Sequence, residues 1–333
     1  MDFKTVAKIE LHLHLDCSLS YAVVSRIDPS VTQDEYRNDF IAPAKCTNLA
    51  DFLKKAPKAI ALMQTEEQLR LVTLDLFEQL QRDNLLYAEI RFAPLLHTQK
   101  GLSAENVVEV VEAAASRGSQ ATGVEARLIL CTLRHFPAEQ SMYMAKLVEH
   151  FKGTRVAALD IAGDEAGFPL DAHIPAFQYA AQNGIPCTAH AGEASGPKSV
   201  WETLEYLHPS RIGHGVRSIE DPALIEHLRE ERFHLELCPT SNIQTDAYAT
   251  YAEHPISRLY ESGLSLSVNT DARTITNITL TQEYEKLHHV FGWDKLHFLR
   301  CNLNAIHAAF LPEAVKQRLE NQLREEYSNS ESC

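Results

Sequence analysis

The feature that most constrains the fold is a repeated alternation of short apolar segments with longer stretches of helical spacing. The short segments, rich in Val, Ile and Leu, are residues 6–15, 85–92, 124–133, 155–163, 185–192, 211–216, 233–241 and 264–272. Stretches such as 104–117 and 221–231 place apolar residues on one helical face. Strands that alternate with helices pair in parallel, and eight of them favour a closed barrel over an open doubly wound sheet. We therefore predict an α/β fold, a (β/α)8 TIM barrel forming one domain over residues 1–333.

The gap between the first two predicted strands is about 70 residues long, too long for a single crossover. It contains two amphipathic stretches, residues 48–64 and 65–84. We predict a helical insertion after the first strand, at about residues 17–84, on the face of the barrel where the strands end. It is either a lid over a buried site or a bundle that only packs there.

Charge and cysteine usage exclude several classes of protein. The chain has 45 Asp and Glu against 31 Lys and Arg, a net charge of −14, which argues against a nucleic-acid or anionic-membrane partner. No apolar run is long enough to span a bilayer, and the first residues do not resemble a signal peptide. The seven cysteines never form CxxC, which fits reduced thiols in a cytoplasmic protein. A metal would therefore be held by His and carboxylate groups.

Polar side chains suited to metal binding or proton transfer stand at the ends of four predicted strands. They are His12, His14 and Asp16 in HLHLD, His190 and Glu193 in HAGE, His214 in GHG and Asp271 in NTD. Alternation along a strand would point His12, His14 and Asp16 to one side. Because catalytic groups of a barrel gather where its strands end, we expect all of these side chains to lie together. His97 and His135 also follow strands but have no assigned role, and His254 is interpreted as a core or solvated residue.

The expected cluster has the chemistry of a catalytic zinc site. Neutral imidazoles with one carboxylate suit Zn²⁺ with an open position, and Zn²⁺ lowers the pKa of a bound water to about 7. Glu193 would lie near the metal without binding it, and a desolvated carboxyl group can act as a general acid. Its alternative role is a carboxylate at the start of a helix near Pro197. His214 is either a general base or a polar contact to the attacking water.

Taken together, the motifs resemble those of one enzyme family. HLHLD, YAEIRFAP, LDIAGDE, HAGE, RIGHG, CPTSN and SVNTD, from Lys8 to about Leu311, are similar to motifs of the adenosine deaminases in the amidohydrolase superfamily. The resemblance implies a zinc-dependent barrel that hydrolyses adenosine or 2′-deoxyadenosine to inosine or 2′-deoxyinosine and ammonia. It implies a purine nucleoside and water as partners. One Zn²⁺ per chain is expected, because LDIAGDE lacks the Lys that dinuclear relatives modify.

The resemblance also implies roles for individual residues. The zinc ligands it implies are His12, His14, His190 and Asp271. Glu193 would protonate purine N1, and His214 would take a proton from the attacking water. The substrate contacts it implies are His14 and Asp16 on the ribose side and the Gly163 backbone N–H at purine N3.

Two positions depart from the family pattern, and both concern the substrate. Ala272 stands where the family commonly has a second Asp that donates a hydrogen bond to purine N7, and Cys17 stands where it usually has Gly. Arg273, Thr274, Asn277 or a water could replace the missing donor. We therefore keep the pocket roles of Cys17, Ala272 and Arg273 open.

Three other functions remain as alternatives. The first is deamination of another 6-aminopurine, namely a 5′-substituted adenosine, aminodeoxyfutalosine or free adenine; Asp16 argues against the free base, which offers it no ribose. The second is a catalytically silent barrel that binds purine or a protein. The third is a zinc hydrolase of esters or lactones, which would not need an acid placed for ring N1.

Overall fold

Eight parallel strands follow one another around a ring in the computed structural model, which describes residues 2–329. They are β1 (Lys8–His14), β2 (Leu85–Phe92), β3 (Glu125–Leu133), β4 (Val156–Ala162), β5 (Thr188–Ala191), β6 (Arg211–His214), β7 (His234–Leu237) and β8 (Ser265–Val268). Neighbours pair within β1–β4 and within β5–β8, and bridges Leu159–Cys187 and Leu13–Asp271 close the ring. The predicted (β/α)8 barrel is confirmed. Residue 1 and residues 330–333 of the predicted domain lie outside the described part.

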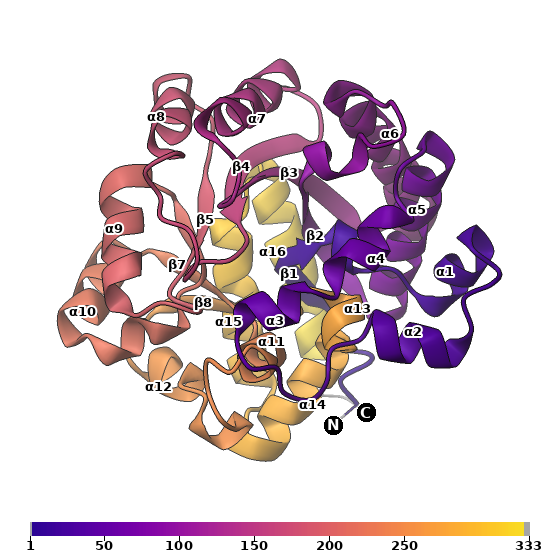
Figure 1. Cartoon of the computed structure of the whole chain (residues 1–333). Helices are drawn as coiled ribbons and strands as arrows, with labels where there is room; N and C mark the ends of the chain where they lie inside the picture. The colour runs from indigo at the N-terminus through magenta and orange to yellow at the C-terminus, as the bar shows by residue number, and fades with distance from the viewer. Residues whose placement is uncertain (1, 330–333) are drawn as a thin grey trace.

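Helices surround the barrel (Figure 1). From β2 onward they are α6 (Ala104–Thr122), α7 (Ala138–His150), α8 (Ile174–Gln182), α9 (Pro197–Leu207), α10 (Pro222–Glu230), α11 (Pro239–Gln244), α12 (Ile256–Glu261), α13 (Arg273–Thr276), α14 (Leu280–Phe291), α15 (Lys295–Ala308) and α16 (Glu313–Asn329), with 3₁₀ turns η2 (Pro94–His97), η3 (Val216–Glu220) and η4 (Tyr251–Glu253). None of the described helices combines the length and hydropathy needed to cross a bilayer.

Between β1 and β2 the chain forms the turn η1 and five helices. They are η1 (Leu15–Cys17), α1 (Tyr21–Ile27), α2 (Gln33–Asp39), α3 (Leu49–Leu53), α4 (Ala56–Ala61) and α5 (Glu66–Arg82). The stretch 48–64 forms two helices instead of one, and Pro57 lies in the first turn of α4, where its missing N–H is tolerated. Backbone hydrogen bonds join Ala42 to Ile275 (2.9 Å) and Cys46 to Gln244 (2.8 Å). The segment before α3 is thereby tied to the helices that follow β7 and β8.

Six predicted strands, those corresponding to β1 and β4–β8, extend past the observed strand at the end where the site lies, and three of these differences affect the site. β1 stops at His14, so Asp16 lies in η1 and the alternation argument does not place it. The segment 233–241 changes from β7 to α11 at Pro239, because proline has no N–H for the strand ladder but fits the first turn of a helix. β8 stops at Val268, which leaves Asp271 on the following loop.

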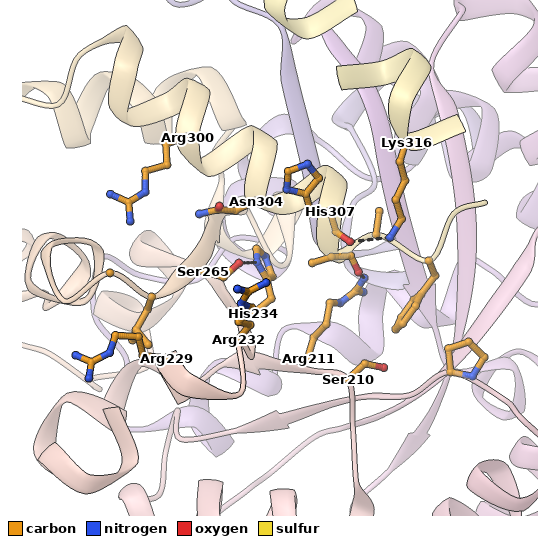
Figure 2. Close-up of a pocket in the computed structure, with 16 residues that line it drawn as sticks. Ser210, Arg211, Arg229, Arg232, His234, Ser265, Arg300, Asn304, His307 and Lys316 are labelled. Carbon is orange, nitrogen blue, oxygen red and sulfur yellow. Dashed lines mark hydrogen bonds between the residues drawn. The ribbon is translucent and has the colours of Figure 1, made fainter. Parts of the chain in front are cut away.

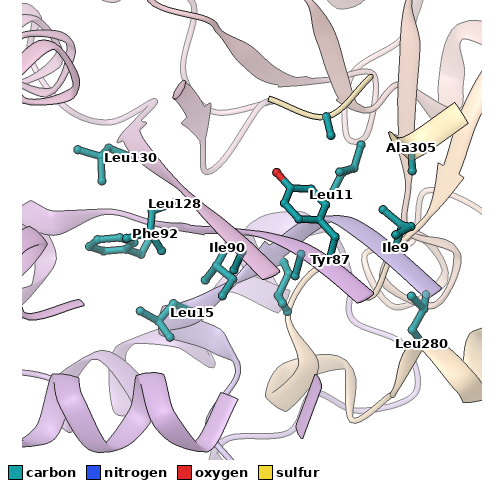
Figure 3. Packing of buried hydrophobic residues seen from close by; sticks show 14 of the residues in the cluster. Ile9, Leu11, Leu15, Tyr87, Ile90, Phe92, Leu128, Leu130, Leu280 and Ala305 are labelled. Carbon is teal, nitrogen blue, oxygen red and sulfur yellow. The ribbon is translucent and has the colours of Figure 1, made fainter. Parts of the chain in front are cut away.

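The side chains of β1 divide between two environments. Ile9, Leu11 and Leu13 are buried in the apolar layer shared by strands and helices, part of which Figure 3 shows. The alternate residues Glu10 and His12 are equally buried but hydrogen-bond with polar groups, as the two-residue period of a strand requires. The inside of the barrel is therefore polar and charged, and this interior supports the site described next.

Candidate active site

Four side chains from three distant parts of the chain converge where the strands end. His12 and His14 come from β1, His190 from β5 and Asp271 from the loop after β8. The Asp271 Oδ1 lies 3.4 Å from the Nε2 of His12 and 3.4 Å from the Nε2 of His14. The Nε2 atoms of His14 and His190 are 3.2 Å apart. A ligand atom of His214 also lies within 4.8 Å of those of His12, His190 and Asp271.

Hydrogen bonds to carboxylates orient two of these imidazoles. Glu236 accepts from the Nδ1 of His12 at 2.8 Å, and Asp160 accepts from the Nδ1 of His190 at 3.2 Å. Each ring then carries its proton on Nδ1 and directs the Nε2 lone pair into the shared space. The His12 Nε2 is buried and has no hydrogen-bond partner among the described residues. Several lone pairs directed at one point repel one another unless a cation lies between them, so this donor set fits a divalent metal.

A single buried arginine holds both of these carboxylates. Arg91 of β2 forms ion pairs with Asp160 at 3.1 Å and with Glu236 at 2.6 Å, and all three side chains are fully buried. The guanidinium fork thereby fixes the orientation of His12 and His190 through their carboxylates. Arg91 belongs to the motif YAEIRFAP, but no role was predicted for it from the sequence. The available signal was a charged residue inside an apolar strand.

Glu193 and His214 lie together beside the converging donors. The His214 Nε2 is 3.5 Å from the Glu193 Oε2, and both side chains are buried. Burial, followed by the negative charges of Asp271 and Glu165, raises the pKa of Glu193 well above its ordinary value. Burial lowers the pKa of His214 well below its ordinary value, and the neighbouring His12 acts in the same direction. Burial thus favours the carboxylic acid form of Glu193 and the neutral imidazole form of His214.

A relay of hydrogen bonds specifies which nitrogen of His214 carries the proton. The Ile256 backbone N–H donates to the His254 Nδ1 (3.2 Å), so the His254 proton is on Nε2, which donates to the Asn242 Oδ1 (3.2 Å). The Asn242 amide nitrogen then donates to the His214 Nδ1 at 3.1 Å. The neutral His214 ring consequently presents an Nε2–H group toward Glu193. Of the two alternatives left open for His254, core or solvated, the structure shows the first, but its place in this relay is not visible in the sequence.

Glu165 fixes the turn that carries Glu193. Its carboxylate accepts backbone N–H groups from Gly192 (2.7 Å), Glu193 (3.0 Å), Ala194 (2.7 Å) and Ser195 (3.0 Å), and the hydroxyl of Ser199 (2.6 Å). These donors lie just before or within the first turn of α9. The carboxylate near the start of α9 is thus Glu165, whereas Glu193 is left to face the site. The alternative interpretation of Glu193 as the residue serving that helix is therefore wrong.

Comparison with known proteins identifies the family of this chain. A family model for adenosine deaminase matches residues 7–326. The chain belongs to the adenosine deaminase family. An adenosine deaminase of Lacticaseibacillus paracasei is 39% identical over 98% of this chain and 99% of its own length. The structure of an adenine deaminase from Arthrobacter aurescens has a TM-score of 0.88 and 26% identity, covering 96% of this chain and 98% of that one.

A third comparison concerns the fold alone. The structure of an amidohydrolase from Burkholderia ambifaria with bound Zn superposes with a TM-score of 0.89 at 21% identity, covering 98% of this chain and 92% of that one. Membership of the adenosine deaminase family makes this chain an aminohydrolase and confirms the resemblance seen in its motifs. The matched region contains every residue of the site described above.

For this deaminase-family chain we expect Glu165→Gln to lower the free energy of unfolding by about 2–4 kcal/mol, measured by urea denaturation. Glutamine keeps one acceptor oxygen, but its NH₂ group would replace the other. That NH₂ group would face backbone N–H groups, such as those of Glu193 and Ala194, which now donate to the carboxylate. Because Glu193 would lose its fixed position, kcat should fall as well. Glu202→Gln, on the exposed face of α9, is the matched control. Equal stability of the two variants would contradict the structural role of Glu165.

The ribose-side residues predicted by the family resemblance lie next to the converging donors. The Asp16 Oδ1 is 4.0 Å from the His14 Nδ1, and burial raises the pKa of Asp16 to about 6. His97, which the sequence left without a role, is fully buried, and its Nε2 is 3.9 Å from the Asp16 Oδ2. Gly163 follows β4 with φ +101, a backbone conformation that favours glycine. His135 has no contact with these groups among the hydrogen bonds and ion pairs of the described residues.

The two departures from the family pattern share one apolar cluster. Cys17 and Ala272 are both buried, and they pack with Leu49 and Phe52 of α3. These side chains therefore form one continuous apolar cluster, which the helical insertion completes. A polar hydrogen-bond donor at position 272 would interrupt it.

The candidates for a replacement hydrogen-bond donor to purine N7 either bond to other protein groups or face solvent. The Arg273 guanidinium forms buried ion pairs with Glu10 (2.8 Å) and Asp83 (3.0 Å). The Thr274 hydroxyl donates to the Leu19 carbonyl at 2.7 Å. Asn277 is exposed at the end of α13. The Arg273 guanidinium is thus held in buried ion pairs, and a pocket role for Arg273 is not supported.

A cavity of about 330 Å³ extends from Glu193 to the protein surface, a size within the range of small-molecule sites. Residues 47–50 of the insertion line one side, and residues 245–247 after α11 line another. Asp164 and Arg217 contribute charged groups to its wall. The cavity connects the acid Glu193 with the surface beneath the start of α3.

Proposed function

We propose that this chain hydrolyses the 6-amino group of adenosine or 2′-deoxyadenosine and releases inosine or 2′-deoxyinosine with ammonia. The observation that carries the proposal is the buried Glu193, whose pKa is raised by burial, placed beside three converging imidazoles and Asp271. A hydrolase of esters has no need for a carboxylic acid at this point, whereas a purine offers it ring nitrogen N1. Relatives named adenosine deaminase that match nearly the full length support the nucleoside substrate.

We propose one Zn²⁺ per chain, held by His12, His14, His190 and Asp271. Support comes from His12 and His190, whose Nδ1 protons are held by Glu236 and Asp160 so that each Nε2 lone pair is free to bind a metal. The buried His12 Nε2 also makes no hydrogen bond among the described residues. Nitrogen and carboxylate donors of this kind are those that zinc prefers. When bound, the metal supplies a Lewis acid that makes water nucleophilic at neutral pH.

The acid step belongs to Glu193. Its protonated carboxyl group donates to purine N1, which draws electron density from C6 and opens that carbon to attack by water. Over the whole reaction the two protons of water are divided between N1 of the product and the departing ammonia. Asp16 and His14 would hold the ribose, and the Gly163 N–H would meet purine N3.

The tautomer of His214 favours a role different from the one the resemblance implies. A base that accepts a proton at Nε2 needs a lone pair there, but the relay through Asn242 places a proton on that atom. We therefore propose that the Nε2–H of His214 donates a hydrogen bond to the attacking oxygen and orients it toward C6.

Asn242→Asp separates the two roles of His214. A carboxylate at this position still accepts from His254, but it also accepts from the His214 Nδ1, so the ring proton would move from Nε2 to Nδ1. If His214 acts as a donor, we expect kcat to fall about tenfold or more with unchanged metal content. An unchanged or increased kcat would restore the general-base role. His254→Gln, which preserves a donor to Asn242, serves as control.

We propose that the insertion at about residues 17–84 covers the site as part of the single barrel domain. Support comes from residues 47–50, which line the cavity at Glu193, and from the apolar packing of Leu49 and Phe52 on Ala272. Substrate would then enter beside α3.

The test is a panel of purines with the zinc-loaded protein. Ultraviolet spectra and ammonia release are measured with adenosine, 2′-deoxyadenosine, adenine and a 5′-substituted adenosine. We expect rapid conversion of the first two. Turnover of adenine or of the 5′-substituted nucleoside alone would retain the mechanism and replace the substrate. No turnover of any of them, with metal bound, would support a purine-binding barrel.

A further inference from the structure

A larger cavity lies at the opposite end of the barrel from Glu193. It has a volume of about 890 Å³ and opens at the first residues of three strands, Arg211 of β6, His234 of β7 and Ser265 of β8. α15 and the start of α16 cover its other side (Figure 2). The active-site groups lie where the strands end, so the length of the barrel separates the two cavities.

The lining of this cavity has one sign of charge. Its cationic residues are Arg211, Arg229, Arg232, Arg300 and Lys316. Within residues 2–329 no Asp or Glu lines it. The whole chain carries a net charge of −14, so a cavity lined by five cationic residues differs in charge from the protein as a whole. Such a concentration of positive charge attracts anions, and its low-dielectric walls strengthen the attraction.

Two of the five cations are already matched by carboxylates outside the cavity. Arg211 is fully buried and forms ion pairs with Glu89 and with Glu236 (2.7 Å). Arg229 lies 3.5 Å from Glu226 on its own helix. Their charges are therefore largely balanced within the protein.

The other three cations have no such balance. Arg232 and Arg300 form no ion pair within the described part of the chain, and the Arg300 guanidinium packs 4.5 Å from the ring centre of Tyr260. Lys316 donates to the backbone carbonyl of His307 at 2.6 Å, a contact that leaves its charge uncompensated. Figure 2 shows Arg300 and Lys316 on the helical side of the cavity, with Arg232 opposite them.

His234 and its neighbours form a neutral polar wall between these cations. Both ring nitrogens of His234 are hydrogen-bonded, to the hydroxyls of Ser265 and Ser267 at 2.9 Å each. The cavity therefore combines cations that lack carboxylate partners with a fixed polar wall, inside a space of small-molecule size.

We propose that this cavity binds a phosphate-bearing anion through Arg232, Arg300 and Lys316. Guanidinium groups match phosphate oxygens with two parallel hydrogen bonds, and an ammonium group adds a point charge. A diphosphate group fits three cations better than a single carboxylate does. A nucleic-acid polymer is disfavoured because the site is a cavity in an otherwise acidic protein. The proposal is independent of the deaminase function.

Calorimetric titration with pyrophosphate and with uridine diphosphate tests it. Both probes carry a diphosphate, and uracil has no 6-aminopurine for the active site. We expect binding that weakens as salt is added and that weakens by about tenfold or more in Arg232→Gln/Arg300→Gln. Tighter binding of uridine diphosphate would assign the cavity to nucleotides, and equal binding would assign it to inorganic diphosphate.

The control is Arg37→Gln/Arg70→Gln, which removes the same charge from two exposed arginines outside the cavity. It should bind both probes like the unmodified protein. Absence of binding at millimolar probe, or an equal loss in the two double variants, would overturn the proposal. Arg232 and Arg300 are exposed, so both variants should fold, which melting temperatures check. Lys316→Gln gives a second, independent removal of a lining charge.

Discussion

Glu193→Gln should abolish nearly all deamination while the protein keeps its metal. Glutamine has almost the same shape as the acid and can still accept from Thr245, but it has no proton to give to purine N1. General acid catalysis is worth about 10²–10⁴-fold, so we expect kcat to fall by that factor. The measurement is ammonia release from adenosine, together with metal content by atomic spectrometry.

The pH profile gives a second readout of the same group. Because burial raises the pKa of Glu193, its acid form persists to higher pH than that of an exposed glutamate, and the rate should decline as pH rises through that pKa. The Gln variant should lose this alkaline limb. Glu78→Gln, a change at an exposed ion pair on α5, should retain normal kinetics. Deamination at a normal rate by the Glu193 variant would contradict the mechanism but not the fold.

The sequence predicted the barrel well because each strand is a local pattern. β2 has the predicted bounds, and β3 and β4 differ by only one residue at an end. The largest errors occur where a strand gives way to site residues, as at Pro239 and Asp271. There the backbone follows turn and helix-start geometry, which alternation of apolar residues does not describe.

The groups that support the site could not be predicted, because their partners are distant in sequence. Arg91 reaches Asp160 and Glu236, which are 69 and 145 residues away. Glu165 serves a turn that begins 27 residues later. A charge inside an apolar strand marks Arg91 as buried but does not name its partners, and nothing local marks Glu165. The strand-end histidines could be located because barrel topology brings all strand ends together. The residue types of the site could thus be predicted from the sequence. The contacts that orient their side chains could not.

His12→Ala should remove metal and activity together. The buried Nε2 of His12 makes no hydrogen bond among the described residues, and loss of the ring also deprives Glu236 of a hydrogen bond. Loss of a partner outside the ligand set typically costs 10–100-fold in metal affinity, so loss of a ligand should cost more than about 100-fold. Equilibrium dialysis with Zn²⁺ and ammonia release measure the two effects.

Two comparisons distinguish ligand loss from misfolding. Glu236→Gln retains the imidazole but weakens its orientation, so its affinity should fall by about 10–100-fold, between the normal protein and His12→Ala. His289→Ala, at an exposed position of α14, should bind metal normally. A chelator should inactivate the unmodified protein, and Zn²⁺ should restore it. If folded His12→Ala kept both metal and turnover, His12 would not be a ligand, and the carboxylate behind it would need another explanation.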